Sequence, residues 1–259
     1  MISLPFPSAV ISLLRDLSAL PYENLSKIAA FHREGASAGA GEKSLLLAAG
    51  WLDKSRESGV GGTCFSLTWW LERRMRAQGL DAAFLMGDKG TLKNIHCALR
   101  FDWEGRAYLL DPGYMIFEPL PLPEAGLSAS AWISPNELRL DHLSERDAWR
   151  LWSGPRGELK YRFDFRRQAV GKEEFLAHWE ASYAFPMMGY PVINRMRDGN
   201  QYYLQKRSLL VRTPEGGTLR KLSEAEMREA LTVTFRLPEP LVREGMEAVM
   251  SLDRDFFRK

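Results

Sequence analysis

The sequence is poor in the residues that mark several large classes of protein. Its 259 residues include only two cysteines and four histidines, and neither type shows the paired spacing of zinc ligands. Cys64 follows glycines and Cys97 follows a histidine, a distribution that does not indicate a disulfide framework. The sequence therefore predicts no metal site, and it favours a reducing, cytoplasmic setting.

An excess of charge, a phosphate-binding loop and a long apolar segment are also missing. The net charge is +2 and no run of Lys or Arg stands out, which argues against a nucleic-acid partner. The longest apolar run, residues 45–52, is far shorter than the roughly 20 residues that cross a bilayer. Pro5 and Pro7 interrupt the apolar start, so we expect neither a signal peptide nor a membrane partner. The remaining composition is that of an ordinary globular protein.

Hydrophobic periodicity divides the chain into three stretches, which we predict to be three domains. Residues 1–80 have helical spacing, residues 81–166 have the pattern of short antiparallel strands, and residues 167–259 are mixed. Helices are expected to begin near residues 8, 25, 43, 64, 172, 224 and 238, with a loop at residues 36–41. Strands are expected at residues 82–86, 94–103, 106–111, 146–152, 158–165, 202–212 and 218–222, and prolines 119, 121 and 123 indicate an irregular connection.

Cys64 lies where a glycine-rich segment gives way to a helical pattern. Residues 59–63 read Gly-Val-Gly-Gly-Thr, and Thr63 is a suitable N-cap. The apolar positions on the same helical face are Leu67, Leu71 and Met75, and Gly79 is a suitable end. The unpaired N–H groups of a helix start favour the thiolate, the reactive form of cysteine. The alternative is that Cys64 is a small buried hydrophobe.

A histidine and an aspartate are predicted to meet on a hairpin. Residues 94–103 and 106–111 have strand patterning, and Glu104-Gly105 is a typical two-residue turn. With that turn Asp111 lies opposite Ala98 and diagonal to His96 on the same face, about 7–8 Å away. Cys97 points to the other face and is expected to pack in the core. A thiol, an imidazole and a carboxylate are the groups that acyl transfer through a cysteine requires.

These motifs resemble those of the arylamine N-acetyltransferases. In that family a cysteine after two glycines, a histidine that opens a strand and an Asp-Val-Gly-Phe-Gly segment occur in the same order as Cys64, His96 and residues 111–115. Three further segments resemble the family: residues 21–24, 118–122 and 182–212. Val60 stands where the family has Arg, so we expect Glu23 to bind backbone N–H groups or another base instead.

The resemblance implies both a fold and a reaction. The fold is α+β, with an N-terminal helical bundle, an antiparallel β-barrel and a C-terminal α/β lid around a core like that of cysteine proteinases. The reaction is ping-pong transfer of an acetyl or related acyl group from acetyl-CoA, as donor substrate, to a small amine such as an arylamine or hydrazine. Cys64 would be the nucleophile, His96 would carry the proton and Asp111 would orient the imidazole. The residues implied to border the substrate are Phe65, Gly113 and Tyr114.

Two other functions fit the same residues. One is a cysteine-dependent amide synthase, transglutaminase-like enzyme or hydrolase. The other is a non-catalytic small-molecule-binding relative, because Val60, Ser66 and Met115 depart from the family's motifs. Trapping an acetyl group on Cys64 separates the first function from a binding protein, and thiol release in the presence of an amine separates transfer from hydrolysis. The sequence indicates neither the acceptor amine nor the oligomeric state.

Overall fold

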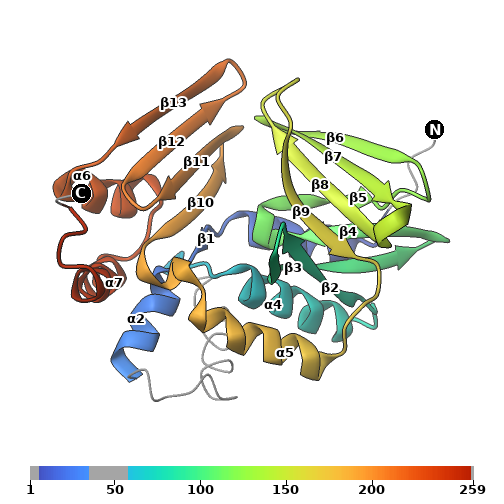
Figure 1. Ribbon diagram of the computed structural model, residues 1–259, viewed down its shortest axis with the longest axis horizontal. Coiled ribbons are helices and arrows are strands. Elements are labelled where there is room, and N and C mark those ends of the chain that lie inside the picture. Colours follow the sequence, from blue (N-terminus) through green and yellow to red (C-terminus); the bar gives the residue numbers. More distant parts are fainter. Residues whose placement is uncertain (1–5, 35–57, 258–259) are drawn as a thin grey trace. The chain divides into compact units, whose positions relative to one another are not determined.

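The computed structural model describes residues 6–34 and 58–257, coloured along the chain in Figure 1. The loop and helix expected within residues 36–55 lie outside these ranges. Backbone contacts divide the chain into two compact units, each assembled from two separate segments. The three consecutive domains expected from the patterning stay a prediction.

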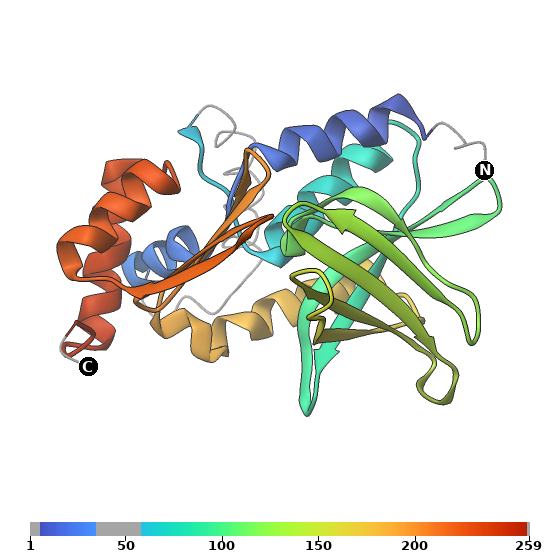
Figure 2. The same ribbon diagram turned by 90° about the horizontal axis from the view of Figure 1, so that it is seen from above.

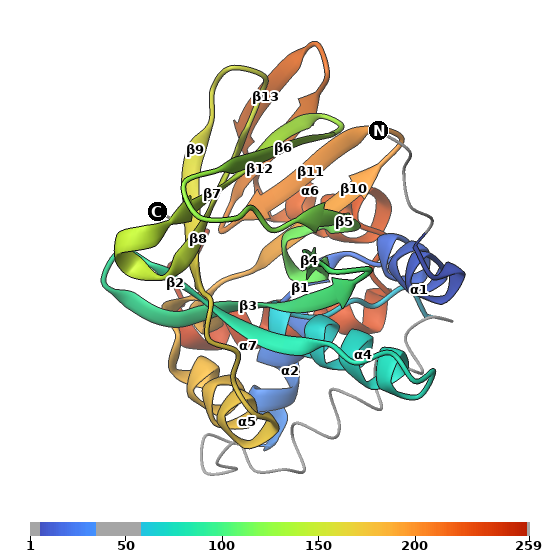
Figure 3. The same cartoon turned by 90° about the vertical axis from the view of Figure 1, so that its right-hand side faces the viewer.

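The first unit comprises residues 1–19 and 67–175, and an antiparallel eight-stranded sheet lies at its centre. The strand order is β5-β4-β3-β2-β9-β8-β7-β6. The strands are β2 Ala83–Lys89, β3 Leu92–Trp103, β4 Arg106–Asp111, β5 Ile116–Pro121, β6 Ser128–Ile133, β7 Asn136–Leu143, β8 Ala148–Gly154 and β9 Lys160–Arg166. The edge strands β5 and β6 contact each other, so the sheet forms a nearly closed barrel (Figure 3). Its core includes Leu85, Ala98, Leu109, Leu138, Leu151 and Phe165.

Two helices of this unit have the apolar faces that the sequence predicted. Helix α1, Ser8–Ser18, begins at Ser8 itself, with Pro7 rather than Ser8 at the N-cap position. Helix α4, Cys64–Arg76, begins at Cys64. The expected apolar face of α4 is buried at Leu67, Leu71 and Met75. Gly79 has a φ of +72°, and the N–H of Leu80 donates to the carbonyl of Met75 at 3.0 Å, which closes the helix as expected.

The second unit comprises residues 20–66 and 176–259 and contains an antiparallel five-stranded sheet in the order β1-β10-β11-β12-β13. The strands are β1 Tyr22–Glu23, β10 Val192–Arg197, β11 Asn200–Gln205, β12 Ser208–Thr213 and β13 Gly216–Lys221. The helices are α2 Leu25–Glu34, α6 Glu224–Glu229, a π-helix Ala230–Thr234 and α7 Glu239–Leu252, while α5 Lys172–Ala181 begins in the first unit. The helices lie beside the sheet (Figure 2), and Ile193, Leu204 and Leu209 of the sheet share a core with Met227 and Met246 of the helices.

The strand predictions were incomplete in several regions. The prolines at 119 and 121 lie in β5, an edge strand, where a missing N–H does not break the ladder. The expected strand 202–212 is two strands, β11 and β12, because the chain turns at Lys206, which has a φ of +53°. The pattern also missed β6, β7 and β10.

Candidate active site

The hairpin of β3 and β4 brings His96 and Asp111 together. Its register is the predicted one: Trp103 pairs with Arg106, and Leu99 pairs with Leu110. Nε2 of His96 lies 2.8 Å from Oδ2 and 3.0 Å from Oδ1 of Asp111. Both side chains are buried, and Asp111 has no exposed surface. The pair therefore has the geometry in which a carboxylate orients an imidazole.

A short turn after β4 provides a further hydrogen bond to Asp111. After Asp111 the chain enters a 3₁₀ turn, Pro112–Tyr114, and the backbone N–H of Tyr114 donates to Oδ1 of Asp111 at 2.9 Å. Proline suits this turn because its φ is preset and no N–H is required of it there. The carboxylate thus accepts a hydrogen bond from the turn and faces the imidazole at the same time.

Aromatic rings enclose the imidazole of His96. The ring of Phe163 is stacked on it, with centroids 4.3 Å apart and an interplanar angle of 12°. Tyr114 lies edge-on at 6.2 Å and Phe165 lies at 5.8 Å. Gly87, on β2, pairs with His96 on β3 and with Phe165 on β9. A Cβ added to Gly87 would lie 3.3 Å from the side chain of each. The missing side chain of Gly87 leaves room for these rings.

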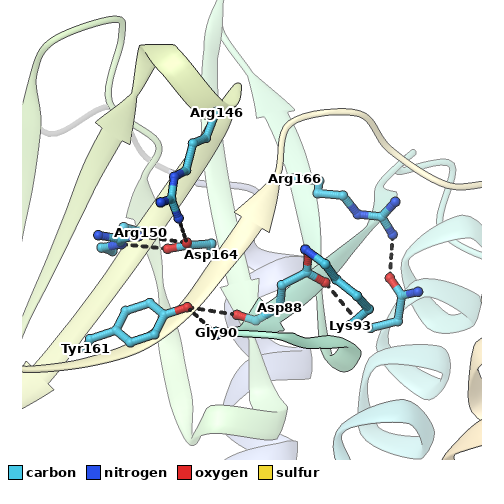
Figure 4. Close-up of polar contacts among 9 residues, drawn as sticks. Asp88, Gly90, Lys93, Arg146, Arg150, Tyr161, Asp164 and Arg166 are labelled. Atoms are coloured by element: carbon cyan, nitrogen blue, oxygen red, sulfur yellow. Dashed lines mark hydrogen bonds and ion pairs between the residues drawn. The ribbon is translucent and has the colours of Figure 1, made fainter.

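Ion pairs on the outer face of the sheet hold the strands that carry this site (Figure 4). Asp88 and Asp164 face each other across β2 and β9. Lys93 lies 2.8 Å from Asp88, and Arg150 forms a fork to Asp164 with distances of 2.7 and 2.8 Å. Since strand side chains alternate between faces, these outward pairs fix the strands whose inward neighbours are Gly87 and Phe165.

Cys64 is the first residue of α4 and is buried, with 5% of its surface exposed. The glycine segment before it is anchored to β1, where Gly62 forms a parallel bridge with Tyr22 and its carbonyl accepts from the N–H of Glu23 at 3.0 Å. A Cβ on Gly61 would lie 1.7 Å from the carbonyl oxygen of Pro21. Only glycine allows the segment to lie this close to the neighbouring backbone. The cap expected from Thr63 stays a prediction.

Glu23 confirms the expectation that local donors replace a basic partner. Its side chain is fully buried, and it accepts hydrogen bonds from the N–H of Ser26, at 2.9 Å, and from the Ser26 hydroxyl. Burial raises the pKa of Glu23, and the opposing hydrogen bonds from Ser26 and the Leu25 backbone only partly offset it. Val60 meanwhile packs in an apolar cluster with Ala29 and Leu241. No arginine is required at position 60.

Phe65 and Gly113, which were expected to border the substrate, are both buried. Phe65 stacks on Trp179, with centroids 6.4 Å apart, and Gly113 lies in the 3₁₀ turn. Their role in substrate binding stays a prediction. Cys97 packs in the core, as expected. Sequence reasoning missed Phe163, because its place beside His96 depends on a strand pairing that no local pattern reveals.

The structure thus joins two of the three predicted catalytic residues. His96 and Asp111 belong to the first unit, whereas Cys64 is counted with the second, and its place in a triad stays a prediction. In residues 6–34 and 58–257 no group of three or more His, Cys, Asp or Glu residues is arranged to hold a metal ion. Of the helices described, none combines the length and apolar character needed to cross a membrane.

Comparisons with known proteins agree with this architecture. No family model and no curated protein matches the sequence, but solved structures match the fold. The arylamine N-acetyltransferase of Nocardia farcinica has a TM-score of 0.76 at 19% identity, over 98% of this chain and 90% of that chain. The enzyme from Mycobacterium abscessus has a TM-score of 0.75 at 18% identity, over 95% and 89%.

A third structure adds information about a ligand in a similar protein. The Mycobacterium marinum arylamine N-acetyltransferase in complex with CoA has a TM-score of 0.74 at 17% identity, over 94% of this chain and 90% of that chain. Coverage of almost the full length of both chains shows that the similarity is one of whole architecture. The chain therefore has the mixed α+β fold of the arylamine N-acetyltransferases, as the sequence motifs implied.

Proposed function

We propose that this chain is a divergent arylamine N-acetyltransferase. It would move an acetyl or related acyl group from acetyl-CoA, through a thioester on Cys64, to a small arylamine, hydrazine or similar amine. The observation that carries the proposal is the buried His96–Asp111 pair, on a chain with this fold and with a cysteine at the start of α4. The complex of CoA with the Mycobacterium marinum enzyme supports a CoA thioester as donor.

Support for joining Cys64 to the pair comes from α4. One helical turn after Cys64, the hydroxyl of Thr68 donates to the carbonyl of Cys97 at 3.3 Å, and Cys97 directly follows His96. We infer that Cys64, His96 and Asp111 act as one triad. With Nε2 of His96 directed at Asp111, Nδ1 is the ring nitrogen that would exchange a proton with the thiol.

The proposed reaction has two steps, acylation of Cys64 and transfer of the acyl group to the amine. Nδ1 of His96 takes the Cys64 proton, the thiolate attacks the thioester carbonyl, and the carbonyl–sulfur bond to CoA breaks. CoA leaves with the proton from the imidazolium, and the acyl group stays on Cys64. The amine then attacks this thioester, His96 removes its extra proton, and that proton returns to the Cys64 sulfur as the amide departs. Backbone N–H groups near Phe65, at the helix start, would stabilise the oxyanion.

The test is to incubate the protein with acetyl-CoA and measure its intact mass. We expect a gain of one acetyl group, located on Cys64 by peptide mapping, and release of CoA thiol when an arylamine is added. Cys64→Ala should abolish the gain, and Cys97→Ala, the control at the other cysteine, should retain it. Release of acetate without any amine would favour a hydrolase. Binding without a mass gain would favour a non-catalytic relative.

Alkylation offers a second test that needs no substrate. Near neutral pH iodoacetamide should modify Cys64 far faster than Cys97, since only Cys64 lies at a helix N-terminus and both side chains are buried. Peptide mapping over time gives both rates. Equal, slow rates would contradict the assignment of Cys64 as the nucleophile.

A further inference from the structure

Strand β9 contains an irregularity beside His96. Phe163 pairs with Leu151 and Tyr161 pairs with Trp152, so Arg162 has no residue opposite it on β8. This is a β-bulge, which redirects a side chain that would otherwise follow the alternation of the strand. Phe163, the residue after the bulge, is the one stacked on the His96 ring.

Arg162 uses its guanidinium to hold Ser153 on β8. Nε donates to Oγ of Ser153 at 2.9 Å, and Nη2 donates to the carbonyl of the same residue at 3.0 Å. Ser153 is 3% exposed. A charged donor that binds both the hydroxyl and the backbone leaves little freedom for the serine side chain. Ser153 is therefore a rigid support for any group that its hydroxyl binds.

That group is the hydroxyl of Tyr114, which lies 2.7 Å from Oγ of Ser153. The ring of Tyr114 meets His96 edge-on, with centroids 6.2 Å apart, and meets Phe163 edge-on at 5.6 Å. Its backbone N–H donates to Asp111. Tyr114 thus contacts both members of the pair, and its far end is tied to a different hairpin of the barrel.

We propose that Tyr114, held by Ser153 and Arg162, is a positioning residue for the His96–Asp111 pair. Ser153 is buried here while Tyr114 and Arg162 are half-buried, and withdrawing polar groups from water is unfavourable unless they bind one another. A phenylalanine would fill the same space without placing a hydroxyl beside Ser153. The hydrogen bonds restrict the Tyr114 ring, and the ring in turn restricts the imidazole.

The kinetic test rests on the proposed function and uses Tyr114→Phe, Ser153→Ala and the double variant. Each single variant should slow acetylation of Cys64 by about tenfold, the equivalent of one hydrogen bond, with KM for acetyl-CoA unchanged. The double variant should be no slower, because both changes break the same link. Tyr108→Phe, on β4, is the matched control. Tyr108 is buried, but its hydroxyl has no hydrogen bond among the described residues. The rate of Cys64 acetylation in Tyr108→Phe should therefore equal that of the wild type.

A spectroscopic test does not depend on any activity. In ¹⁵N-histidine-labelled protein at about pH 8, where an ordinary histidine is neutral, His96 should show a single tautomer with the proton on Nε2. Tyr114→Phe and Ser153→Ala should each broaden this signal or mix the tautomers, and Tyr108→Phe should not. Altered spectra without acetylation of the wild type would reject the proposed function and keep the positioning role. An unchanged His96 signal in both variants would overturn the positioning role.

Discussion

Asp111 is the residue whose replacement tests the orientation of the imidazole. Asp111→Asn keeps the shape of the side chain but places an amide against Nε2 of His96, which favours the wrong tautomer. We expect kcat to fall by a factor on the order of 10⁴, as in the corresponding serine-protease variant. Circular dichroism should show an unchanged fold.

The control for this substitution lies on the same hairpin. Asp102→Asn removes an exposed carboxylate that pairs with Arg100 at 2.9 Å, and it should leave the rate unchanged. A fall of less than about tenfold in Asp111→Asn would mean that another group orients His96, and the triad would have to be abandoned.

Glu23 should make the stability of the protein depend on pH. Burial raises its folded-state pKa, so between the ordinary carboxyl range and the raised value the folded protein binds more protons than the unfolded chain. The free energy of unfolding therefore decreases as the pH rises through this window. Glu23→Gln should remove that decrease, because the amide still accepts from the Ser26 N–H and carries no charge.

Urea unfolding of both proteins from about pH 4 to about pH 8 measures the difference. Glu226→Gln is the control of opposite sign. Hydrogen bonds from Ser223 lower the pKa of Glu226, so its contribution is present at higher pH and lost as the pH falls through the lowered value. Parallel pH profiles for wild type and Glu23→Gln would contradict the role of burial at Glu23.

At the scale of elements, the glycine segment before Cys64 depends on apolar packing rather than on an ion pair. Val60 is 2% exposed and contacts Ala29 and Leu241. Val60→Arg would place a guanidinium in this cluster, and we expect a loss of about 2–5 kcal/mol in the free energy of unfolding. Urea denaturation measures it.

The matched control is Val233→Arg, which changes an exposed valine of the same unit and should alter stability little. If Val60→Arg proved as stable as the wild type, the new side chain would have to reach Glu23 through open space. Packing of Val60 with Ala29 and Leu241 argues against that space.

Elements differ in how well local sequence predicts them. The Glu104-Gly105 turn has positive φ at both residues, as a two-residue hairpin turn requires, and the capping box of Ser223 and Glu226 forms as expected. Strands β6 and β10 lacked so clear a signal, because no residue of β6 is buried and the first four residues of β10 are all buried. In β7 buried and half-buried residues do alternate, a local pattern that the strand prediction missed.

At the scale of the whole molecule, each unit needs segments that are distant in sequence. Strand β1 pairs with β10, and α2 packs against α7. Nζ of Lys27, on α2, lies 2.5 Å from Oγ of Ser182 and 4.0 Å from the ring centroid of Tyr183. A fragment of residues 1–175 lacks all these partners, and an isolated helix of this length is unstable in water.

We therefore expect trypsin to cleave the fragment after Lys27 at least about tenfold faster than the full-length chain, since cleavage follows local opening. Mass spectrometry of the products gives both rates. Cleavage after Arg150, which is paired with Asp164 in the barrel, is the control and should stay slow in both. Equal rates at Lys27 would show that α2 does not depend on the C-terminal segment.

The sequence by itself determined the features that depend on a few neighbouring residues. The turn at Glu104-Gly105 set the register of β3 and β4, and that register placed Asp111 beside His96. Glycines before Cys64 and apolar residues after it placed the thiol at the start of a helix. These features are predictable because backbone sterics and side-chain alternation act over short stretches of chain.

Only the tertiary structure decided which distant side chains surround that pair. Phe163 stacks on His96, and the bulge at Arg162 turns the guanidinium to Ser153, because β9 pairs with both β2 and β8. Likewise, the packing of Val60 against Ala29 and Leu241 appears only once α2, α7 and the glycine segment meet. Such contacts join residues far apart in the chain, so they follow from the packing of the whole fold and leave no local pattern.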